Sequence, residues 1–267
     1  MTSDTPGHDS PGHDTPGLEA RPASVAVLAA AVGSPDDSAT VAAAVAATVA
    51  DAGPAERDTL LVAALRAAVP HAAVALTERG LPRSLAAASV ADVDRKLARY
   101  GLHGTGVEWL VAVVTGRVVA VGRLQFELGD HLADGTPAWG VHVPETGPLD
   151  PAACDRSFAG APEVLRGFAG HLAADRWQCR SWMLDPGLPA ALGPDANLVR
   201  FARRFRLVPP GEHDATEGDA SVAKFVFGVP LATARSAAPS GRLRAAVLDR
   251  WAGGGHWTER TGTAPVA

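Results

Sequence analysis

The chain has 267 residues, of which 47% are hydrophobic and 20% are charged, as in ordinary globular proteins. Its formal net charge of −5 and its lack of a basic block argue against nucleic acid as a partner. Two cysteines, Cys154 and Cys179, cannot build a disulfide framework, and without a CxxC motif they predict no metal site. The longest early apolar run, Val25 to Val32, is too short to cross a bilayer, so we expect a cytoplasmic protein without membrane contact.

Aromatic residues are distributed unevenly along the chain. The sequence has 7 Phe, 6 Trp and 1 Tyr, and the first of them is Tyr100. This boundary excludes a uniform repeat protein and predicts two compositionally different parts. The basic residues are almost all arginine, because only Lys96 and Lys224 are lysines, and this bias is typical of an Arg-rich, Ala-rich genome.

Residues 1–22 are predicted to form a disordered tail, because Pro, Gly, Asp and Ser dominate them and little can be buried. A Pro-Gly-His-Asp unit occurs at Pro6 to Asp9 and again at Pro11 to Asp14. Its His and Asp are of metal-ligand type. A flexible tail is the favoured interpretation, because nothing fixes these ligands in a cage.

Residues 23–105 predict a small Ala-rich helical domain. Apolar residues recur at helical spacing between Pro54 and Pro70, at Leu60, Leu61, Ala64, Leu65 and Ala68. A second helix over Val41 to Val49 is capped by Asp36, Asp37 or Ser38, and a third, holding Val93, Leu97 and Tyr100, is capped by Ser89 or Asp92. Such small side chains give a thin core, so we expect this domain to depend on its neighbour for stability.

The sequence pattern of residues 106–267 predicts strands that alternate with helices. The predicted strands are Val107–Val114, Val118–Leu128, Ala138–Val143, Trp177–Leu184, Arg206–Val208 and Val222–Val229, the last two pairing across the acidic loop 211–219. The first two form a hairpin around the turn 115–117.

Three helices complete the predicted order β-β-β-α-β-α-β-β-α. The first begins after Leu149, with Asp150 as its cap and Pro151 at its first helical position. Pro162 is expected to kink or split it. Asp195 caps the second, with a buried stripe of Leu198, Phe201, Ala202 and Phe205, and the last runs from about Gly241 to Trp251. The predicted fold class is α+β, a small N-terminal helical domain followed by a mixed sheet flanked by helices.

The stretch from Val141 to Pro151 carries the chemical signal. It reads as a strand, a Pro/Gly turn and a capped helix. Such a turn leaves backbone N–H groups and a positive helix end at a groove, where an anion such as a pyrophosphate can bind. An ordinary connection between a strand and a helix is the alternative.

Five short sequence motifs, found in one order over residues 107–260, resemble those of a known family. They are Gly122-Arg123-Leu124-Gln125-Phe126-Glu127, Val141-His142-Val143-Pro144-Glu145, Gly147-Pro148-Leu149, Cys179 to Pro186, and Asn197-Leu198-Val199-Arg200-Phe201. They are similar to bacterial proteins that join a helical N-terminal domain to a GNAT-like C-terminal acyltransferase domain, within the GNAT superfamily of acyl-CoA N-acyltransferases. The resemblance implies transfer of an acyl group from a CoA or carrier thioester to an amine of a small molecule or peptide. It implies acyl-CoA as co-substrate and no metal.

The resemblance also implies that Val143, Thr146, Gly147 and Leu149 bind the CoA. The usual superfamily motif at this place is Gln or Arg, two residues, Gly, one residue, and Gly or Ala. Here Pro148 removes an amide, and Glu145 adds a negative charge where an anion is expected. A phosphopantetheine carrier as donor, or a binding module that kept the fold without catalysis, therefore stay as alternatives.

Four residues are candidates for catalysis. His142 is a candidate general base, against a structural histidine, and Glu145 a base or amine ligand, against a loop carboxylate. Ser181 is a candidate acid for the leaving thiolate. Cys179, on the same strand face, is a candidate nucleophile for an acyl-enzyme if His142 deprotonates it, against a small buried cysteine. A Cys/His thioester hydrolase or acyl-enzyme transferase is therefore a further alternative function.

Four further residues are candidates for substrate binding. Arg123, Gln125 and Glu127 form a polar row on one strand face, which either lines the acceptor cleft or is simply solvated. Asn197 either caps a helix or contacts a ligand. Near the end of the chain, Trp257 is expected to dock the tail, with a closing flap as the alternative.

Overall fold

The computed structural model describes residues 19–34, 37–210 and 214–267. Both Pro-Gly-His-Asp units of the predicted tail lie outside these ranges, as do the candidate cap Asp36 and residues 211–213 of the predicted acidic loop. The end of the predicted tail is held in place, because Arg21 donates to the carbonyl oxygen of Thr48 and to Asp51.

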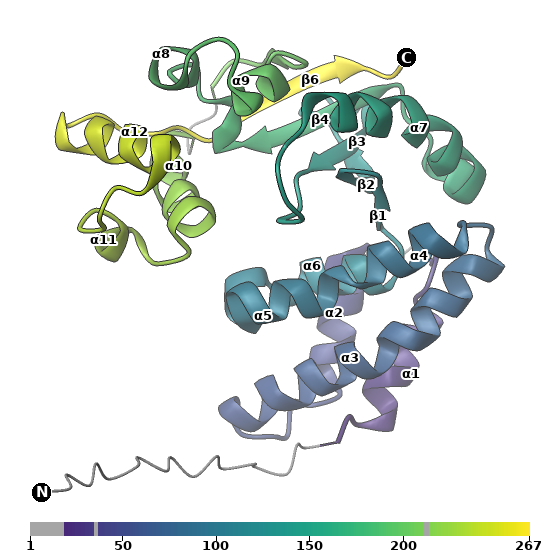
Figure 1. Ribbon diagram of the computed structural model, residues 1–267. Helices are drawn as coiled ribbons and strands as arrows, with labels where there is room; N and C mark the ends of the chain where they lie inside the picture. Colours follow the sequence, from purple (N-terminus) through teal and green to yellow (C-terminus); the bar gives the residue numbers. More distant parts are fainter. Residues whose placement is uncertain (1–18, 35–36, 211–213) are drawn as a thin grey trace, which may run out of the picture.

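The described part of the chain before residue 115 consists of six helices (Figure 1). They are α1 (Pro22–Ala30), α2 (Ser38–Ala47), α3 (Pro54–Glu78), α4 (Arg83–Val90), α5 (Asp92–Thr105) and α6 (Val107–Val114). The predicted apolar stripe of α3 is buried from Leu60 to Ala68, and Asp37 caps α2 by accepting from the Thr40 amide at 2.7 Å. Pro70 lies inside α3 rather than after its end, with Ala72 and Leu76 continuing the buried stripe beyond it.

Two residues predicted as caps of α5 have other partners. Ser89 accepts from the Ala120 amide at 2.8 Å and donates to the Leu85 carbonyl, so it ties α4 to the sheet. Asp92 is fully buried, pairs with Arg95 and accepts from the Trp109 indole at 3.0 Å. The Ser89 contact joins the helical part to the sheet, and the Asp92 contacts join α5 to α6, so neither side chain caps a helix.

The segment Val107–Val114 forms α6, so the prediction of a first strand there is wrong. All five residues from Leu110 to Val114 are buried. A short, wholly apolar run fits a buried helix as well as a buried strand, and periodicity does not separate the two. The hairpin lies instead within the segment predicted as the second strand. It consists of β1 (Val118–Val121), a turn at Gly122-Arg123 and β2 (Leu124–His131). Gly122 is required in this turn, because its φ is +62° and a Cβ there would lie 2.7 Å from the Ser157 Oγ.

The described strands form one sheet in the order β1-β2-β3-β4-β6-β5. The remaining strands are β3 (Pro137–His142), β4 (Arg176–Ser181), β5 (Arg206–Leu207) and β6 (Arg260–Pro265). Only β3 and β4 pair in parallel, through Trp139 with Trp177 and Gly140 with Gln178. Beyond these two pairs the strands separate, which places a gap in the middle of the sheet.

The final strand is β6, and the prediction that Val222–Val229 is a strand is wrong. Residues 214–222 form α10 (Asp214–Val222), followed by the π-helical turn η3 (Ala223–Phe227). The partner of β5 is β6, which also pairs with β4 along its whole length. The sequence of β6, Arg-Thr-Gly-Thr-Ala-Pro, has little intrinsic strand preference, so its pairing comes from tertiary context.

One face of the sheet is covered by α7 (Pro151–Ala169) and α9 (Asn197–Ala202). Phe158 of α7 contacts Phe126, Trp177 and Phe205, and this aromatic cluster fills the space between α7 and the strands. As predicted, Asp150 caps α7 by accepting from the Ala153 amide at 2.7 Å. Pro162 lies inside α7 without splitting it.

The α9 helix and the end of β4 differ from the prediction in detail. The N-cap residue of α9 is Ala196, with no side-chain cap, so neither Asp195 nor Asn197 caps this helix. Phe201 and Phe205 of the predicted stripe are buried. The fourth strand ends at Ser181, and Trp182–Leu184 form the 3₁₀ turn η2.

The C-terminal helices form a smaller lobe beyond the end of β4 and the start of β6 (Figure 1). They are α8 (Leu188–Leu192), α10, α11 (Leu231–Ala234) and α12 (Gly241–Ala252), the last as predicted. Trp257 is completely buried among them, so it docks the chain before β6, as expected. Asp219 accepts from the Trp257 amide at 2.8 Å and from the Trp251 indole at 2.7 Å.

A single hydrophobic core runs from the helical part into the sheet. It extends from Leu28 of α1 to Phe205 beyond α9, through the buried residues of α6 and β1. The apolar helix α3 is long enough to cross a membrane by length and composition, but it packs against α1, α4, α5 and α6 as a core helix does. The two parts are therefore one packing unit.

Candidate active site

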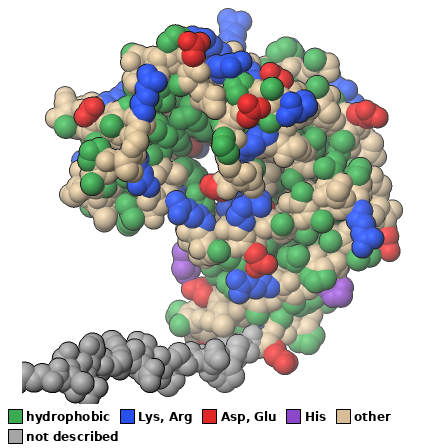
Figure 2. All heavy atoms as spheres, viewed as in Figure 1, with side chains coloured by type: hydrophobic (Ala, Val, Ile, Leu, Met, Phe, Trp, Pro, Cys, Tyr) green, Lys and Arg blue, Asp and Glu red, His purple; other side chains and the backbone are tan. Residues whose placement is uncertain are grey.

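A pocket of about 480 Å³ opens at the gap where β3 and β4 separate. This volume is in the range of small-molecule sites. Figure 2 shows the molecule hollowed between the C-terminal lobe and the helical part, with basic side chains on the rim. Residues from the helical part, the sheet and the C-terminal lobe line the pocket, so the site exists only when all three are assembled.

The pocket is lined by residues from both faces of the sheet. Strand register pairs Gln125 with His142 and Glu127 with Gly140, so these polar residues share one face. Trp109 of α6 stacks edge-on against His142, which places the helical part on that face. The opposite face carries Phe126 and the helices α7 and α9. The gap therefore lies between a polar face, with Gln125 and His142, and a face that is covered by α7 and α9.

His142 is held by two neighbours. Its Nε2 lies 2.9 Å from the Glu127 Oε2, and its ring centroid lies 4.6 Å from that of Trp109. Asp92 in turn holds the Trp109 indole. Although burial alone would raise the pKa of Glu127, the hydrogen bond and charge of His142 lower that pKa below its ordinary value. Glu127 thus orients the imidazole, and no described residue bonds to Nδ1, which leaves this atom available as a base.

Gln125 lies opposite His142 and is almost fully buried, with 1% of its surface exposed. Its Nε2 has no hydrogen-bond partner among the described residues, although it lies at the pocket wall. A buried amide without a partner is costly. A polar group of a ligand would satisfy it.

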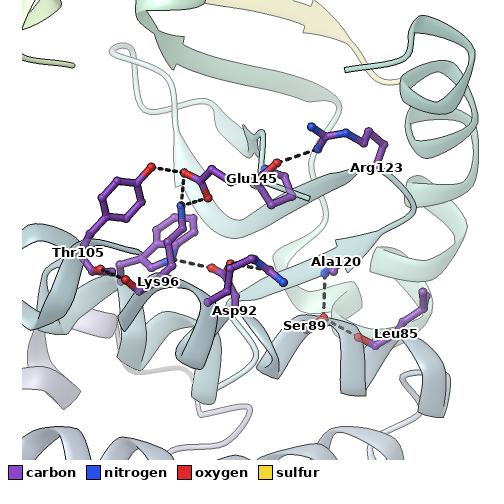
Figure 3. A network of polar contacts seen from close by, with 12 residues as sticks. Leu85, Ser89, Asp92, Lys96, Thr105, Ala120, Arg123 and Glu145 are labelled. Atoms are coloured by element: carbon purple, nitrogen blue, oxygen red, sulfur yellow. Dashed lines mark hydrogen bonds and ion pairs between the residues drawn. The ribbon is translucent and has the colours of Figure 1, made fainter. Parts of the chain in front are cut away.

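Glu145 turns toward the helical part and is neutralised there. Its carboxylate lies 3.1 Å from the Lys96 Nζ and accepts from the Tyr100 hydroxyl at 2.5 Å (Figure 3). Burial alone would raise the pKa of Glu145, but the Tyr100 hydroxyl and the Lys96 charge hold it below its ordinary value. Burial and the bond to Glu145 raise the pKa of Tyr100. The negative charge in the turn is therefore paired with Lys96.

Arg123 organises the turn that follows β3. Its guanidinium donates to the carbonyl oxygens of Pro144, Gly147 and Pro148 at 2.9, 2.7 and 2.8 Å. These bonds fix the turn from the end of β3 to the start of α7. Arg123 is thus a positioning residue of the turn.

The predicted amide donors of this turn differ in availability. The Thr146 amide bonds to the Pro144 carbonyl, and the Asp150 carboxylate already caps α7. The amides of Val143, Gly147 and Leu149 have no acceptor within the described ranges. These three amides are free to bind a ligand, despite the proline in the motif.

Cys179 and Ser181 lie at the gap on the face opposite His142. Alternation along β4 puts both on the face of Trp177, away from Gln178 and its partner Gly140. Cys179 is buried, and this burial raises the pKa of its thiol to about 12. Ser181 accepts from the Met183 amide at 3.1 Å, which leaves its hydroxyl proton free for a ligand.

The pocket gathers most of the predicted site residues. Those that line it are Arg123, Gln125, His142, Val143, Glu145, Leu149, Cys179 and Ser181. Glu127 acts behind His142, whereas Thr146, Gly147 and the exposed Asn197 do not line the pocket. Asn197 makes none of the described side-chain contacts.

Several lining residues were not predicted, because they come from distant segments. The helical part supplies Lys96, Tyr100, Thr105 and Trp109, and the C-terminal segments supply Lys224, Phe225 and Glu259. One sequence signal pointed to them. The only two lysines and the only tyrosine of the chain all lie at this pocket.

Comparison with known proteins places this site in context. A family model described as the GNAT-like C-terminal domain matches residues 118–264. No curated protein matches the chain. A solved structure of an acyltransferase in complex with decanoyl-CoA and teicoplanin is 31% identical, with a TM-score of 0.71 over 80% of this chain and 68% of that chain. A structure of an acyltransferase with CoA and 10C-teicoplanin is 30% identical, with the same TM-score and coverage. A third, with decanoyl-CoA alone, is 28% identical, with a TM-score of 0.69 over 78% of this chain and 66% of that chain.

Proposed function

The chain belongs to the GNAT-like C-terminal domain family, and from this premise we propose that it transfers an acyl group from acyl-CoA to an amine. The observation that carries the proposal is the open gap between β3 and β4, with the Glu127–His142 pair on one side and free backbone amides on the other. A thioester entering from one face and an amine entering from the other would meet in this gap. Holding two reactants in line lowers the barrier of a bimolecular reaction.

The amine would be activated by His142. Its Nδ1 would take the proton as the amine nitrogen attacks the thioester carbonyl carbon, while Glu127 stabilises the resulting imidazolium through Nε2. A C–N bond forms and the C–S bond breaks. The Ser181 hydroxyl would donate its proton to the leaving thiolate and regain one from solvent.

The donor would lie along the amides of Val143, Gly147 and Leu149. These N–H groups are free among the described residues and suit the carbonyl and phosphate oxygens of an acyl-CoA. Apolar side chains at the gap suit an acyl chain, among them Trp182, Met183 and Leu198. The related acyltransferases are complexed with decanoyl-CoA, so we propose a medium-chain acyl group.

The acceptor would be a small molecule or peptide with a free amine. One related acyltransferase is complexed with teicoplanin, which makes a glycopeptide a suitable first acceptor to test. We further propose a cytoplasmic location, in keeping with the two free buried thiols, Cys154 and Cys179.

The buried thiol favours direct transfer over an acyl-enzyme. Cys179 lies on the face opposite His142, and its pKa of about 12 keeps it protonated at neutral pH. The pocket is open, with Trp139 buried in the core rather than filling the gap. This geometry gives no support to a binding module with a blocked groove.

The test is release of free thiol from acetyl-, octanoyl- and decanoyl-CoA in the presence of amines, including teicoplanin. We expect turnover with a medium-chain donor, a loss of about 10²-fold or more in His142→Gln, and little change in His131→Gln, an exposed histidine on β2. The Cys179→Ala variant should stay within about twofold of the parent. Absence of turnover together with absence of thermal stabilisation by any acyl-CoA would overturn the proposal, and a covalent acyl adduct lost in Cys179→Ala would overturn direct transfer.

A further inference from the structure

The two lysines of the chain converge on one tyrosine ring at the pocket, although they lie far apart in sequence. The Nζ atoms of Lys96 and Lys224 are 5.3 and 5.2 Å from the centroid of the Tyr100 ring. All other basic residues of the chain are arginines. Lysine ammonium groups, which are compact charges on flexible side chains, therefore occur at this pocket and nowhere else in the chain.

Lys224 has no anionic partner in the structure. Its ammonium makes contacts with the rings of Tyr100 and Phe225, at 5.2 and 4.9 Å, but no hydrogen bond or ion pair with another described residue. Burial and the charge of Lys96 lower the pKa of Lys224, and the opposing charges of Glu145 and Glu259 do not offset this effect. Lys96 is already paired with Glu145, and Glu259 accepts from Ser221. An anion beside Lys224 would complete the site.

The backbone around Lys224 supports a role in the pocket. Residues 223–227 form a π-helical turn, closed by the Gly228 amide to the Ala223 carbonyl at 3.1 Å. Such turns are rare and often lie at functional sites. This one presents Phe225 edge-on to Tyr100, with the ring centroids 5.8 Å apart. Phe225 is 40% exposed, unusual for a large apolar side chain in this protein.

The lysines lie on the side from which the amine must arrive. Trp109 and Glu145 link α5 and α6 to the His142 face, and Arg180, on that same face, pairs with Glu217 of α10. The free amides proposed for the donor lie in the turn that leads to α7, a helix that packs on the opposite face. A nucleophile that gives its proton to His142 approaches from the lysine side.

We infer that Lys224, with Lys96 and the Tyr100–Phe225 ring pair, binds a carboxylate of the acceptor, so the acceptor is an amine that also carries an acid group, as amino acids and peptides do. This inference rests on the proposed function, since it identifies the acceptor of the same site. The ammonium would form a charge-assisted hydrogen bond to the carboxylate in a partly desolvated place. The rings would contact apolar parts of the same molecule.

The inference is tested by calorimetry with dipeptides that end in an aromatic residue, each as the free acid and as the C-terminal amide. We expect the acids to bind the parent about tenfold more tightly than the amides. This preference should vanish in Lys224→Met and survive in Lys224→Arg, which keeps the charge. Arg242→Met, at an exposed site on α12, is the matched control for loss of one positive charge and should keep the preference.

Binding is measured without turnover, so this test stays separate from that of the proposed function. Equal binding of acid and amide forms by the parent, including no binding of either, would overturn the inference. So would a Lys224→Met variant that weakens both forms alike, or one that instead weakens the calorimetric binding of CoA, since the lysine would then hold a donor phosphate. Failure of thiol release alone would overturn the acyl transfer and not the carboxylate site.

Discussion

The buried carboxylate of Asp185 fixes the chain that leads into β6, and replacing it with asparagine should unfold the protein at a much lower temperature. Its side chain is fully buried and accepts four hydrogen bonds. One oxygen accepts from the Gly187 amide at 2.7 Å and from Arg250 at 2.9 Å. The other accepts from the amide and the hydroxyl of Thr258, at 2.8 and 2.7 Å. Asp185→Asn keeps only one of these oxygens.

The magnitude follows from the donors that lose their acceptor. Whichever way the new amide points, its NH₂ faces at least one buried donor, and each unsatisfied buried donor costs about 1–3 kcal/mol. The substitution also removes the charge that is paired with Arg250. Together these losses predict about 3–5 kcal/mol, as for other broken buried pairs. At about 2–4 °C per kcal/mol, the Tm should fall by roughly 10 °C.

The assay is thermal and urea unfolding of the parent and three variants. Asp195→Asn makes the same chemical change at an exposed carboxylate and should stay within about 0.5 kcal/mol of the parent. Thr258→Val removes only the hydroxyl bond and should cost about 1 kcal/mol. If Asp185→Asn were no less stable than Asp195→Asn, the assignment of Asp185 as the anchor of this segment would be refuted.

Two further predictions concern the pocket. Because the pKa of Glu145 is lowered on folding, its contribution to stability is full above the ordinary value of 4.5 and is lost as the pH falls through the lowered pKa. Glu145→Gln should therefore cost about 1 kcal/mol at neutral pH and nothing in strong acid, and urea unfolding that shows a pH-independent difference would contradict this. Leu198→Trp should reduce turnover with decanoyl-CoA at least about tenfold more than with acetyl-CoA, because Leu198 lines the gap. Equal losses with the two donors would show that the acyl chain lies elsewhere.

Local patterns predicted the part of the site that lies on adjacent segments of the chain. Alternation along β2 placed Gln125 and Glu127 on one face, and the strand register, which the sequence did not predict, adds His142 opposite Gln125. The cap at Asp150 followed from its position before a proline. The alternation and the cap each depend on residues within a few positions of each other, so the sequence alone carries them.

The remaining features depend on contacts between distant segments. The apolar run Val107–Val114 becomes a helix because α2 and α5 surround it, and β6 becomes a strand because β4 and β5 lie on either side. The partner of Glu145 is Lys96, a pairing across 49 residues that no local pattern reveals. The acidic residue in the turn suggests an obstacle to an anion in the sequence, but its pairing with Lys96 compensates its charge in the fold.

The placement of the pocket walls has a consequence for how such proteins diversify. The family match begins at residue 118, so Lys96, Tyr100 and Trp109 lie before it, while His142, Glu127 and Ser181 lie within it. Under the proposed mechanism, bond making belongs to the matched segment, whereas part of the recognition surface belongs to the helices that precede it. Exchange or drift of the preceding helices can then give a lineage a new acceptor while its reaction stays the same, and kinship across the sheet alone does not reveal which molecule is modified.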